Sequence, residues 1–276
     1  MVTQGKTVNN HPNGMVLIRQ RVLIWQLIQR ELGQRYRGSY LGFLWSIITP
    51  LFMLLIYTFV FSGIFKASWQ VNGPDTSTSD FALILFAGLM PFNVFSEVGN
   101  RASLLVISVP NYVKKVVFPL EVLSVVSLGV AIIQSLIGIA LLVIANLIIH
   151  SSVSPTLFLL PLAYLPLIFL CLGVSWFLAS LGVFIRDLSQ GIPIVVQVLF
   201  FLSPIVYPLE MGPANLRPIL LANPLTSIIE GFRQVTLWGG PLPWVDWAVI
   251  TLLMLIFAGL GYFWFARTKK GFADVL

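Results

Sequence analysis

Between Arg37 and Lys66 the chain carries no charged side chain, and most residues of this stretch are apolar. A helix needs about 20 apolar residues to cross the hydrocarbon core of a membrane, so this stretch is long enough to span it. Of all 276 residues, 58% are hydrophobic and only 9% are charged, whereas roughly a quarter are charged in soluble domains. The sequence therefore predicts an all-α integral membrane protein, because helices satisfy their own backbone hydrogen bonds in lipid.

Similar apolar runs recur along the chain, separated by polar or proline-containing turns. We predict six transmembrane helices, at about 41–65, 81–104, 122–149, 157–185, 192–209 and 244–266. The second span contains Glu97 and Arg101, which are one helical turn apart and favour a local pair. A charge that faces hydrocarbon at mid-bilayer costs about 2.5–3.5 kcal/mol, so this polar face should look inward or toward the surface.

The segments before and between the spans are more polar. We expect residues 1–14 to be a disordered tail and residues 15–276 to form a single transmembrane domain. Residues 15–37 have a mainly apolar side with Ile24 and Ile28 and a mainly polar side with Arg30, which is typical of a helix lying in the headgroup plane. An ordinary amphipathic helix that docks on a soluble partner is the alternative.

Two further short helices are predicted outside the spans. Residues 110–119 are bracketed by prolines and contain a lysine pair as well as apolar residues, so we expect a short cytoplasmic helix that presses against another protein. Within residues 210–243, Asn223 and Pro224 form a helix start. The helix that follows should be re-entrant or interfacial at the outer surface, with Glu230 and Arg233 on its polar face and the apolar residues opposite.

The distribution of Lys and Arg sets the orientation of the chain. With both termini in the cytoplasm, only Lys66, Arg217 and Arg233 fall outside. The inside group comprises Lys6, Arg19, Arg21, Arg30, Arg35, Arg37, Arg101, Lys114, Lys115, Arg186, Arg267, Lys269 and Lys270. This asymmetry follows the positive-inside rule. The net charge of +6 is therefore interpreted as attraction to anionic membrane lipids, and not to nucleic acid.

The sequence shows no motif for an intrinsic energy source or for catalysis. Metal-ligand clusters, a P-loop and a nucleophile elbow are missing, and the spans lack the chain of ionisable residues expected in an ion-coupled transporter. The single cysteine, Cys171, fits a small buried hydrophobe. A chain that moves cargo uphill must then use a separate motor subunit, and the segment around Lys114 is a plausible contact for it.

The order of these parts resembles the membrane-spanning subunit of ABC exporters for bacterial surface polysaccharides, the permeases for O-antigen, capsule and teichoic acid. The resemblance is carried by residues 30–32, 35–42, 45–50, 86–89, 111–121, 186–187, 203–205 and 223–225. The sequence of residues 111–121, Asn-Tyr-Val-Lys-Lys-Val-Val-Phe-Pro-Leu-Glu, most resembles the corresponding segment of the O-antigen permeases. The match extends over nearly the whole chain after Gly14.

The resemblance implies a homodimer that joins two ATP-binding cassette subunits. ATP and magnesium would bind the partner subunits, no cofactor would bind this chain, and this chain would not be an enzyme. Residues 110–119 would be the coupling helix. The implied ATPase contacts are Asn111, Tyr112, Lys114, Lys115, Phe118, Arg186 and Asp187.

The implied substrate is a glycan linked to a polyprenyl diphosphate, in the cytoplasmic membrane. Arginines bind diphosphates through charge-assisted hydrogen bonds, so the candidate substrate residues are Arg30, Arg35, Tyr36 and Arg37. Topological anchoring is the alternative role for these arginines. Alternative functions are export of teichoic acid, capsule, drugs or small lipids. A membrane enzyme acting on lipid-linked sugars would need outer acidic residues such as Glu210, Glu230 or Asp246.

Overall fold

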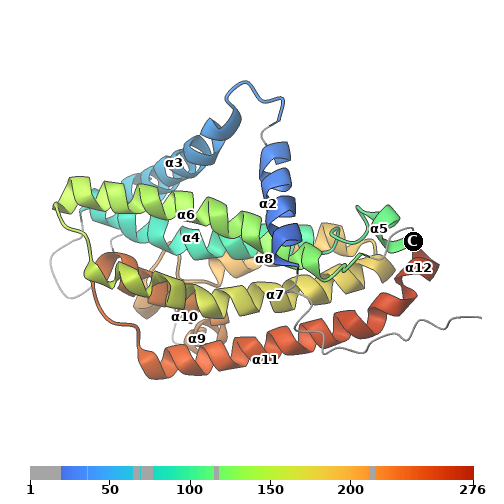
Figure 1. Ribbon diagram of the computed structural model, residues 1–276. Helices are drawn as coiled ribbons and strands as arrows, with labels where there is room; N and C mark the ends of the chain where they lie inside the picture. Colours follow the sequence, from blue (N-terminus) through green and yellow to red (C-terminus); the bar gives the residue numbers. More distant parts are fainter. Residues whose placement is uncertain (1–19, 36, 65–68, 70–76, 115–117, 212–214) are drawn as a thin grey trace, which may run out of the picture.

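The computed structural model describes residues 20–35, 37–64, 69, 77–114, 118–211 and 215–276, and every regular element in these ranges is a helix (Figure 1). Within these ranges, four helical segments are long and apolar enough to cross a membrane. They are α4 (Thr78–Ala102), α6 (Val122–His150), η3 with α7 (Pro155–Leu159 and Leu160–Phe184) and α11 (Trp244–Thr268) with its C-terminal extension.

The first and fifth predicted spans are shorter apolar helices. The first consists of η1 (Gly42–Leu44) and α3 (Trp45–Thr58), which continues as a π-helical stretch, η2 (Phe59–Ile64). The fifth is α8 (Leu188–Phe201), which begins and ends earlier in the chain than the predicted range 192–209. Ser203 Oγ donates to the Leu199 carbonyl at 2.7 Å, and Pro204 has no N–H to continue the ladder.

The long helices α4, α6, α7 and α11 run side by side (Figure 1). Helices α7 and α11 approach closely because glycines face each other: a Cβ built on Gly261 would lie 2.5 Å from the Gly173 carbonyl oxygen. Small residues allow membrane helices to gain van der Waals contact in this way. The pair forms one side of the bundle.

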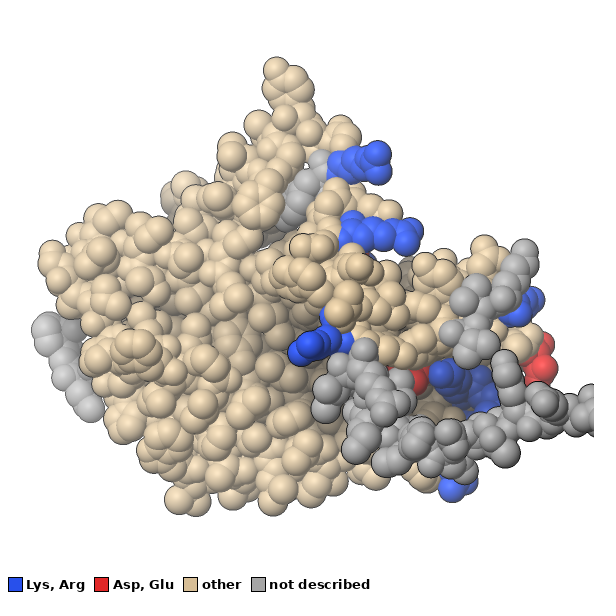
Figure 2. All heavy atoms as spheres, in the orientation of Figure 1, with Lys and Arg blue, Asp and Glu red and all other residues tan. Residues whose placement is uncertain are grey.

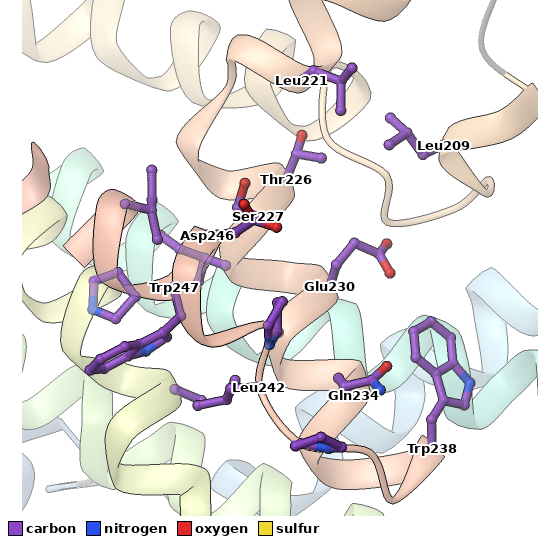
Figure 3. Close-up of a pocket in the computed structure, with 17 residues that line it drawn as sticks. Leu209, Leu221, Thr226, Ser227, Glu230, Gln234, Trp238, Leu242, Asp246 and Trp247 are labelled. Atoms are coloured by element: carbon purple, nitrogen blue, oxygen red, sulfur yellow. The ribbon is translucent and has the colours of Figure 1, made fainter. Parts of the chain in front are cut away.

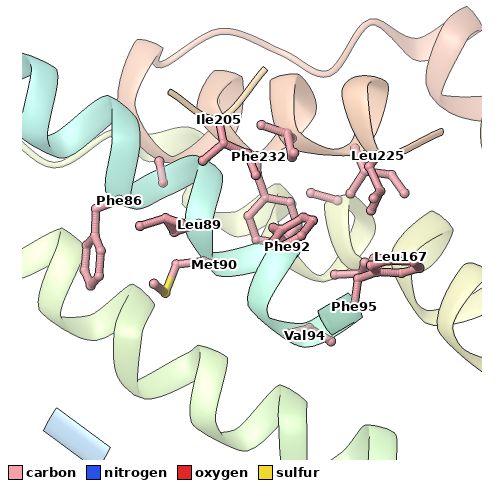
Figure 4. Packing of buried hydrophobic residues seen from close by; sticks show 14 of the residues in the cluster. Phe86, Leu89, Met90, Phe92, Val94, Phe95, Leu167, Ile205, Leu225 and Phe232 are labelled. Atoms are coloured by element: carbon pink, nitrogen blue, oxygen red, sulfur yellow. The ribbon is translucent and has the colours of Figure 1, made fainter. Parts of the chain in front are cut away.

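The main hydrophobic core surrounds α4. Figure 4 shows Phe92 and Phe95 of α4 near Leu167 of α7 and Phe232 of α10, with Phe86 farther along α4. All these side chains are buried. Helix α4 is therefore the central helix of the bundle, contacted by α3, α6, α7, α8 and α10.

The two ends of the bundle differ in content. The end with α5 (Pro110–Lys114) also holds η6 (Lys269–Gly271) and α12 (Phe272–Val275), and we call it the α5 end (Figure 1). The opposite end, the α10 end, holds α9 (Arg217–Ala222), α10 (Pro224–Arg233) and the π-helical η5 (Gln234–Trp238). In the view of Figure 2, Lys and Arg gather near α2 and the α5 end, and the opposite part of this face shows none.

Helix α2 (Arg21–Arg35) stands steeply to the bundle and packs on α6 (Figure 1). Ile28 is buried against Val122, Val126 and Val130, while Arg30 is exposed. The apolar side predicted from the sequence thus faces the protein's own α6. The predicted tail 1–14 and the first residues of the predicted helix lie outside the described residues.

Helix α10 begins as the sequence predicts. Asn223 Oδ1 accepts a hydrogen bond from Leu225 N at 3.0 Å, and Pro224 occupies the first turn. The Asn223 amide also donates to the Leu202 carbonyl and to Ser203 Oγ, at 3.1 and 3.0 Å. One side chain therefore caps α10 and ties it to the turn after α8.

Candidate functional site

A groove of about 900 Å³ lies between α3, α4, α6 and α8. Its polar lining includes Asn93, Ser96, Glu97, Asn100, Gln134, Ser135 and Gln197, and its aromatic lining includes Trp45, Tyr57, Phe86, Phe92 and Phe200. Asn93 and Gln197 are exposed, and the buried Oδ1 of Asn100 has no hydrogen-bond partner among the described residues. Polar groups are costly in hydrocarbon, so a polar groove in apolar helices marks a candidate path for cargo.

Aromatic rings follow one another along this groove. Phe200 of α8 stacks on Tyr57 of α3, with centroids 5.9 Å apart, and meets Phe92 of α4 edge-on at 5.3 Å. Ring faces offer apolar area, while amides donate and accept hydrogen bonds. The lining can thus contact a molecule that has both apolar faces and many hydroxyl groups.

Ion pairs join α2 to α4 at one end of the groove. Arg35 donates to Glu97, and Arg101 donates to Glu31 of α2. The local pair predicted between Glu97 and Arg101 is a longer contact, at 3.7 Å. The prediction was incomplete because sequence spacing shows partners on one helix only, whereas α2 supplies the shorter contacts here.

The predicted substrate residues have different surroundings. Arg35 lines the groove and is paired with Glu97, whereas Arg30 and Arg37 are exposed and outside the lining. Tyr36 lies outside the described residues. The structure therefore brings one of the predicted arginines to the groove, beside Glu97, which the sequence had paired with Arg101 instead.

The predicted ATPase contacts lie at the α5 end. Asn111 and Lys114 of α5 are exposed, and Tyr112 stacks on Phe118 with ring centroids 4.5 Å apart. Arg186 and Asp187 are exposed in the turn between α7 and α8. Lys115 lies outside the described residues.

At the α10 end, the predicted position of Arg233 on the outer polar face was wrong. Its side chain is completely buried and donates to the carbonyls of Ile84, Pro204 and Ile205 at 3.1, 2.6 and 2.9 Å. The guanidinium lies over the ring of Trp69, 4.3 Å from the centroid. Periodicity placed Arg233 opposite the apolar face of α10, but segments distant in sequence cover that side.

Glu230 completes this arrangement. Its Oε1 accepts from Arg233 Nη1 at 2.8 Å. Burial lowers the pKa of Arg233 to about 10 even though the neighbouring Glu230 carboxylate partly offsets this effect, and the guanidinium stays charged at neutral pH. Burial also raises the pKa of Glu230 above its ordinary value, and Arg233 partly offsets this effect. Glu230 is thus partnered to a structural cation.

A second cavity, of about 480 Å³, lies beside this cluster. Figure 3 shows Glu230 and Gln234 projecting from α10 and η5, Trp247 from α11, and Trp238 at the end of η5. Trp247 Nε1 donates to the Leu162 carbonyl at 2.9 Å, which fixes that ring. Most of the wall is apolar. Within the described residues no group of three or more His, Cys, Asp or Glu could hold a metal ion.

The comparison with known families decides the class of this chain. The model of the ABC-2 type transporter family matches residues 22–237, which include α2, the groove and α10. The chain belongs to the ABC-2 type transporter family. The resemblance seen in residues 111–121 is thereby confirmed, and this ABC-2 chain is an integral membrane protein and a transport subunit.

Named relatives of this ABC-2 chain align with most of its length. An O-antigen export system permease protein RfbA of Klebsiella pneumoniae is 27% identical over 92% of this chain and 95% of the relative. An RfbA of Myxococcus xanthus is 29% identical over 79% and 82%. A polysialic acid transport protein KpsM of Escherichia coli is 29% identical over 91% and 95%.

Proposed function

We propose that this chain is the permease subunit of an ATP-driven exporter of lipid-linked polysaccharide in the cytoplasmic membrane, with an O-antigen-type glycan as the favoured cargo. The groove between α3, α4, α6 and α8 carries the proposal, because aromatic rings and amides suit sugar rings and their hydroxyl groups. The names of the relatives, which refer to O-antigen export and polysialic acid transport, support the same cargo class.

A homodimer would close the groove. Apolar side chains of α3 and α8 are exposed in the single chain, among them Phe52, Leu55, Ile194 and Val198. A symmetric second copy would cover these faces and build a conduit from two grooves. Two ATP-binding cassette subunits would bind ATP and magnesium and drive transport.

The proposed orientation places the α5 end and both termini in the cytoplasm, with six membrane crossings. Lys114, Arg186, Lys269 and Lys270 lie at the α5 end, whereas the described basic residues of α9 and α10 are Arg217 and Arg233. This bias follows the positive-inside rule. The shorter α3 and α8 would cross together with the irregular segments that continue them.

In this orientation α2 lies at the cytoplasmic interface, and Arg35 stands where a lipid diphosphate would enter the groove. Its guanidinium is bound to the Glu97 carboxylate, so a diphosphate would compete with Glu97 for it. Arg30 and Arg37 are exposed near the same end of α2 and would add to the attraction, as would Tyr36. Asn111, Tyr112, Lys114, Lys115 and Phe118, with Arg186 and Asp187, would meet the ATPase subunit.

The test uses the permease reconstituted with the ATPase subunit that co-purifies with it from native membranes. Asn93→Leu and Gln197→Leu should lower ATP-dependent export of lipid-linked glycan at least tenfold, because both remove exposed polar groups from the groove. Thr251→Leu on α11 is the matched control, since its hydroxyl lies outside the groove lining. Assembly with the ATPase should be unchanged in all three variants.

Two results would overturn the proposal. One is export at the control rate by both groove variants. The other is a chain that purifies with no ATPase subunit and stays active.

For the arginines, Arg35→Ala and Arg37→Ala should weaken stimulation of ATPase activity by lipid-linked glycan. Full export by correctly inserted variants would leave these arginines with topological anchoring alone.

A further inference from the structure

The C-terminal residues fold back onto the bundle as a separate short element. After α11, η6 leads into α12, where Phe272 is completely buried. Its ring meets Phe184 of α7 and Phe265 of α11 edge-on, with centroids 6.0 and 5.5 Å apart. A single helical turn is unstable alone, so packing of Phe272 is what holds α12 in place.

An ion pair fixes the same segment to the start of α6. Lys269 Nζ donates to Glu121 Oε2 at 2.7 Å, and the Glu121 side chain is largely buried. The Glu121 carbonyl in turn accepts from Trp176 Nε1 of α7 at 3.1 Å. Glu121 directly precedes α6 and closes the segment that begins with α5. The pair therefore connects the C-terminus to the base of the proposed coupling segment.

Helix α12 also contacts α5 itself. The structure places α12 against both α5 and α7, and Figure 1 shows α12 beside α5 at one end of the bundle. Leu276 packs on the same apolar cluster as Tyr112 and Phe118. Helix α12 thus connects α5 with the C-terminal end of α7, which leads into the turn with Arg186 and Asp187.

The remaining side of α12 is open. Ala273, Asp274 and Val275 are exposed, as are Asn111 and Lys114 of α5. Among the described residues, the apolar cluster contacts α12 through Phe272 and Leu276. The exposed side is continuous with the surface that α5 offers.

We propose that residues 269–276 are a third part of the ATPase docking surface: they brace α5 from behind and present Asp274 and Val275 to the ATPase subunit beside α5. This inference rests on the proposed function, since it needs an ATPase partner. Lys269, Glu121 and Phe272 act as positioning residues, and they transmit force between α5, α6 and α11. Without the contacts made by residues 269–276, α5 loses its fixed orientation on the bundle.

Charge reversal tests the brace. Lys269→Glu and Glu121→Lys should each lower the ratio of glycan exported to ATP hydrolysed at least fivefold, and the double variant should recover most of the ratio. Arg267→Glu is the matched control, because it makes the same charge change two residues away, where Arg267 lies over the Phe263 ring. The bracing role would be overturned if the single variants had the same export-to-hydrolysis ratio as Arg267→Glu. It would also be overturned if the double variant did not recover the ratio.

Cross-linking tests the docking surface. The only cysteine, Cys171, is buried and is replaced by Ser, after which Asp274→Cys, Asn111→Cys and Ser151→Cys are made separately in the complex from native membranes. We expect Asp274→Cys and Asn111→Cys to cross-link to the ATPase subunit, and Ser151→Cys, at the opposite end, to give no product. Cross-linking from Asn111→Cys alone would overturn this inference and leave the proposed function intact. If no variant cross-links and no ATPase subunit co-purifies, both this inference and the proposed function are wrong.

Discussion

At the α10 end the chain buries the cation of an ion pair completely, whereas toward the α5 end the cations of its ion pairs stay partly exposed. Arg233 has no exposed area and binds three carbonyls and a carboxylate. In the pair between Lys269 and Glu121, and in the pair between Arg35 and Glu97, the cation remains about one third or more exposed. The two ends therefore use the same residue types under different dielectric conditions.

This difference in exposure indicates which end of the bundle can rearrange at the lower free-energy cost. Removing one partner of a buried ion pair costs about 3–5 kcal/mol, because an uncompensated charge or carbonyl is left in the interior. An exposed pair contributes about 0–1 kcal/mol. The α10 end is thus the more costly of the two to rearrange.

Replacing Arg233 should have the largest effect. Arg233→Met keeps an unbranched side chain but leaves the Ile84, Pro204 and Ile205 carbonyls and Glu230 without their donor, at a cost of about 3–5 kcal/mol. Thermal unfolding of the purified protein in detergent measures the loss. Arg217→Met changes an exposed arginine at the same end and should be near neutral. Equal melting temperatures for the two variants would contradict the structural role of Arg233.

Gly88→Ala should come next. A Cβ on Gly88 would lie 2.6 Å from Arg233 Nη2, so α4 must shift or the guanidinium must leave its carbonyls. Overpacking of this kind costs about 1–3 kcal/mol. Gly99→Ala is the control on the same helix, because its Cβ would meet Val196 at 3.5 Å, an ordinary contact. Equal melting temperatures for the two variants would show that a Cβ on Gly88 does not disturb the Arg233 guanidinium.

Asn223→Ala should have a smaller effect. The substitution removes the N-cap of α10 and the two hydrogen bonds to the turn after α8, and loss of a cap costs about 1 kcal/mol. Asn223→Asp keeps the acceptor and loses the donors, so its stability should fall between those of Ala and wild type. Denaturant titration followed by Trp fluorescence orders the three proteins. Wild-type stability of the Ala variant would show that the cap contributes nothing.

Glu97→Gln, nearer the α5 end, should have the smallest effect on global stability. It removes the charge that holds Arg35 and contacts Arg101, and such partly exposed pairs contribute at most about 1 kcal/mol. The change should appear as faster amide exchange in α2. High salt should speed exchange in wild-type α2 more than in the variant, because ions screen exposed pairs and, among the described residues, α2 of the variant keeps only the pair between Arg101 and Glu31. A fall in melting temperature as large as that of Arg233→Met would remove the contrast between the two ends.

Local features of the sequence predicted much of the helix arrangement. Long apolar runs predicted helices at the positions of α4, α6, α7 and α11, because lipid leaves the backbone no partner except its own helix. Asn223 with Pro224 predicted the start of α10, since capping is a contact between near neighbours. The resemblance in residues 111–121 predicted the family that residues 22–237 match.

Tertiary structure alone decided which polar residues are structural. Arg233 follows the polar side of α10 in the sequence, yet Trp69, Ile84 and Pro204 arrive from distant segments and cover it. Glu97 and Arg101 look like a self-contained pair until α2 supplies nearer partners. Composition and contacts between neighbouring residues were enough to predict the membrane class, the start of α10 and the family. The buried cation, the groove and the C-terminal brace depend on contacts between remote residues, which no local pattern contains.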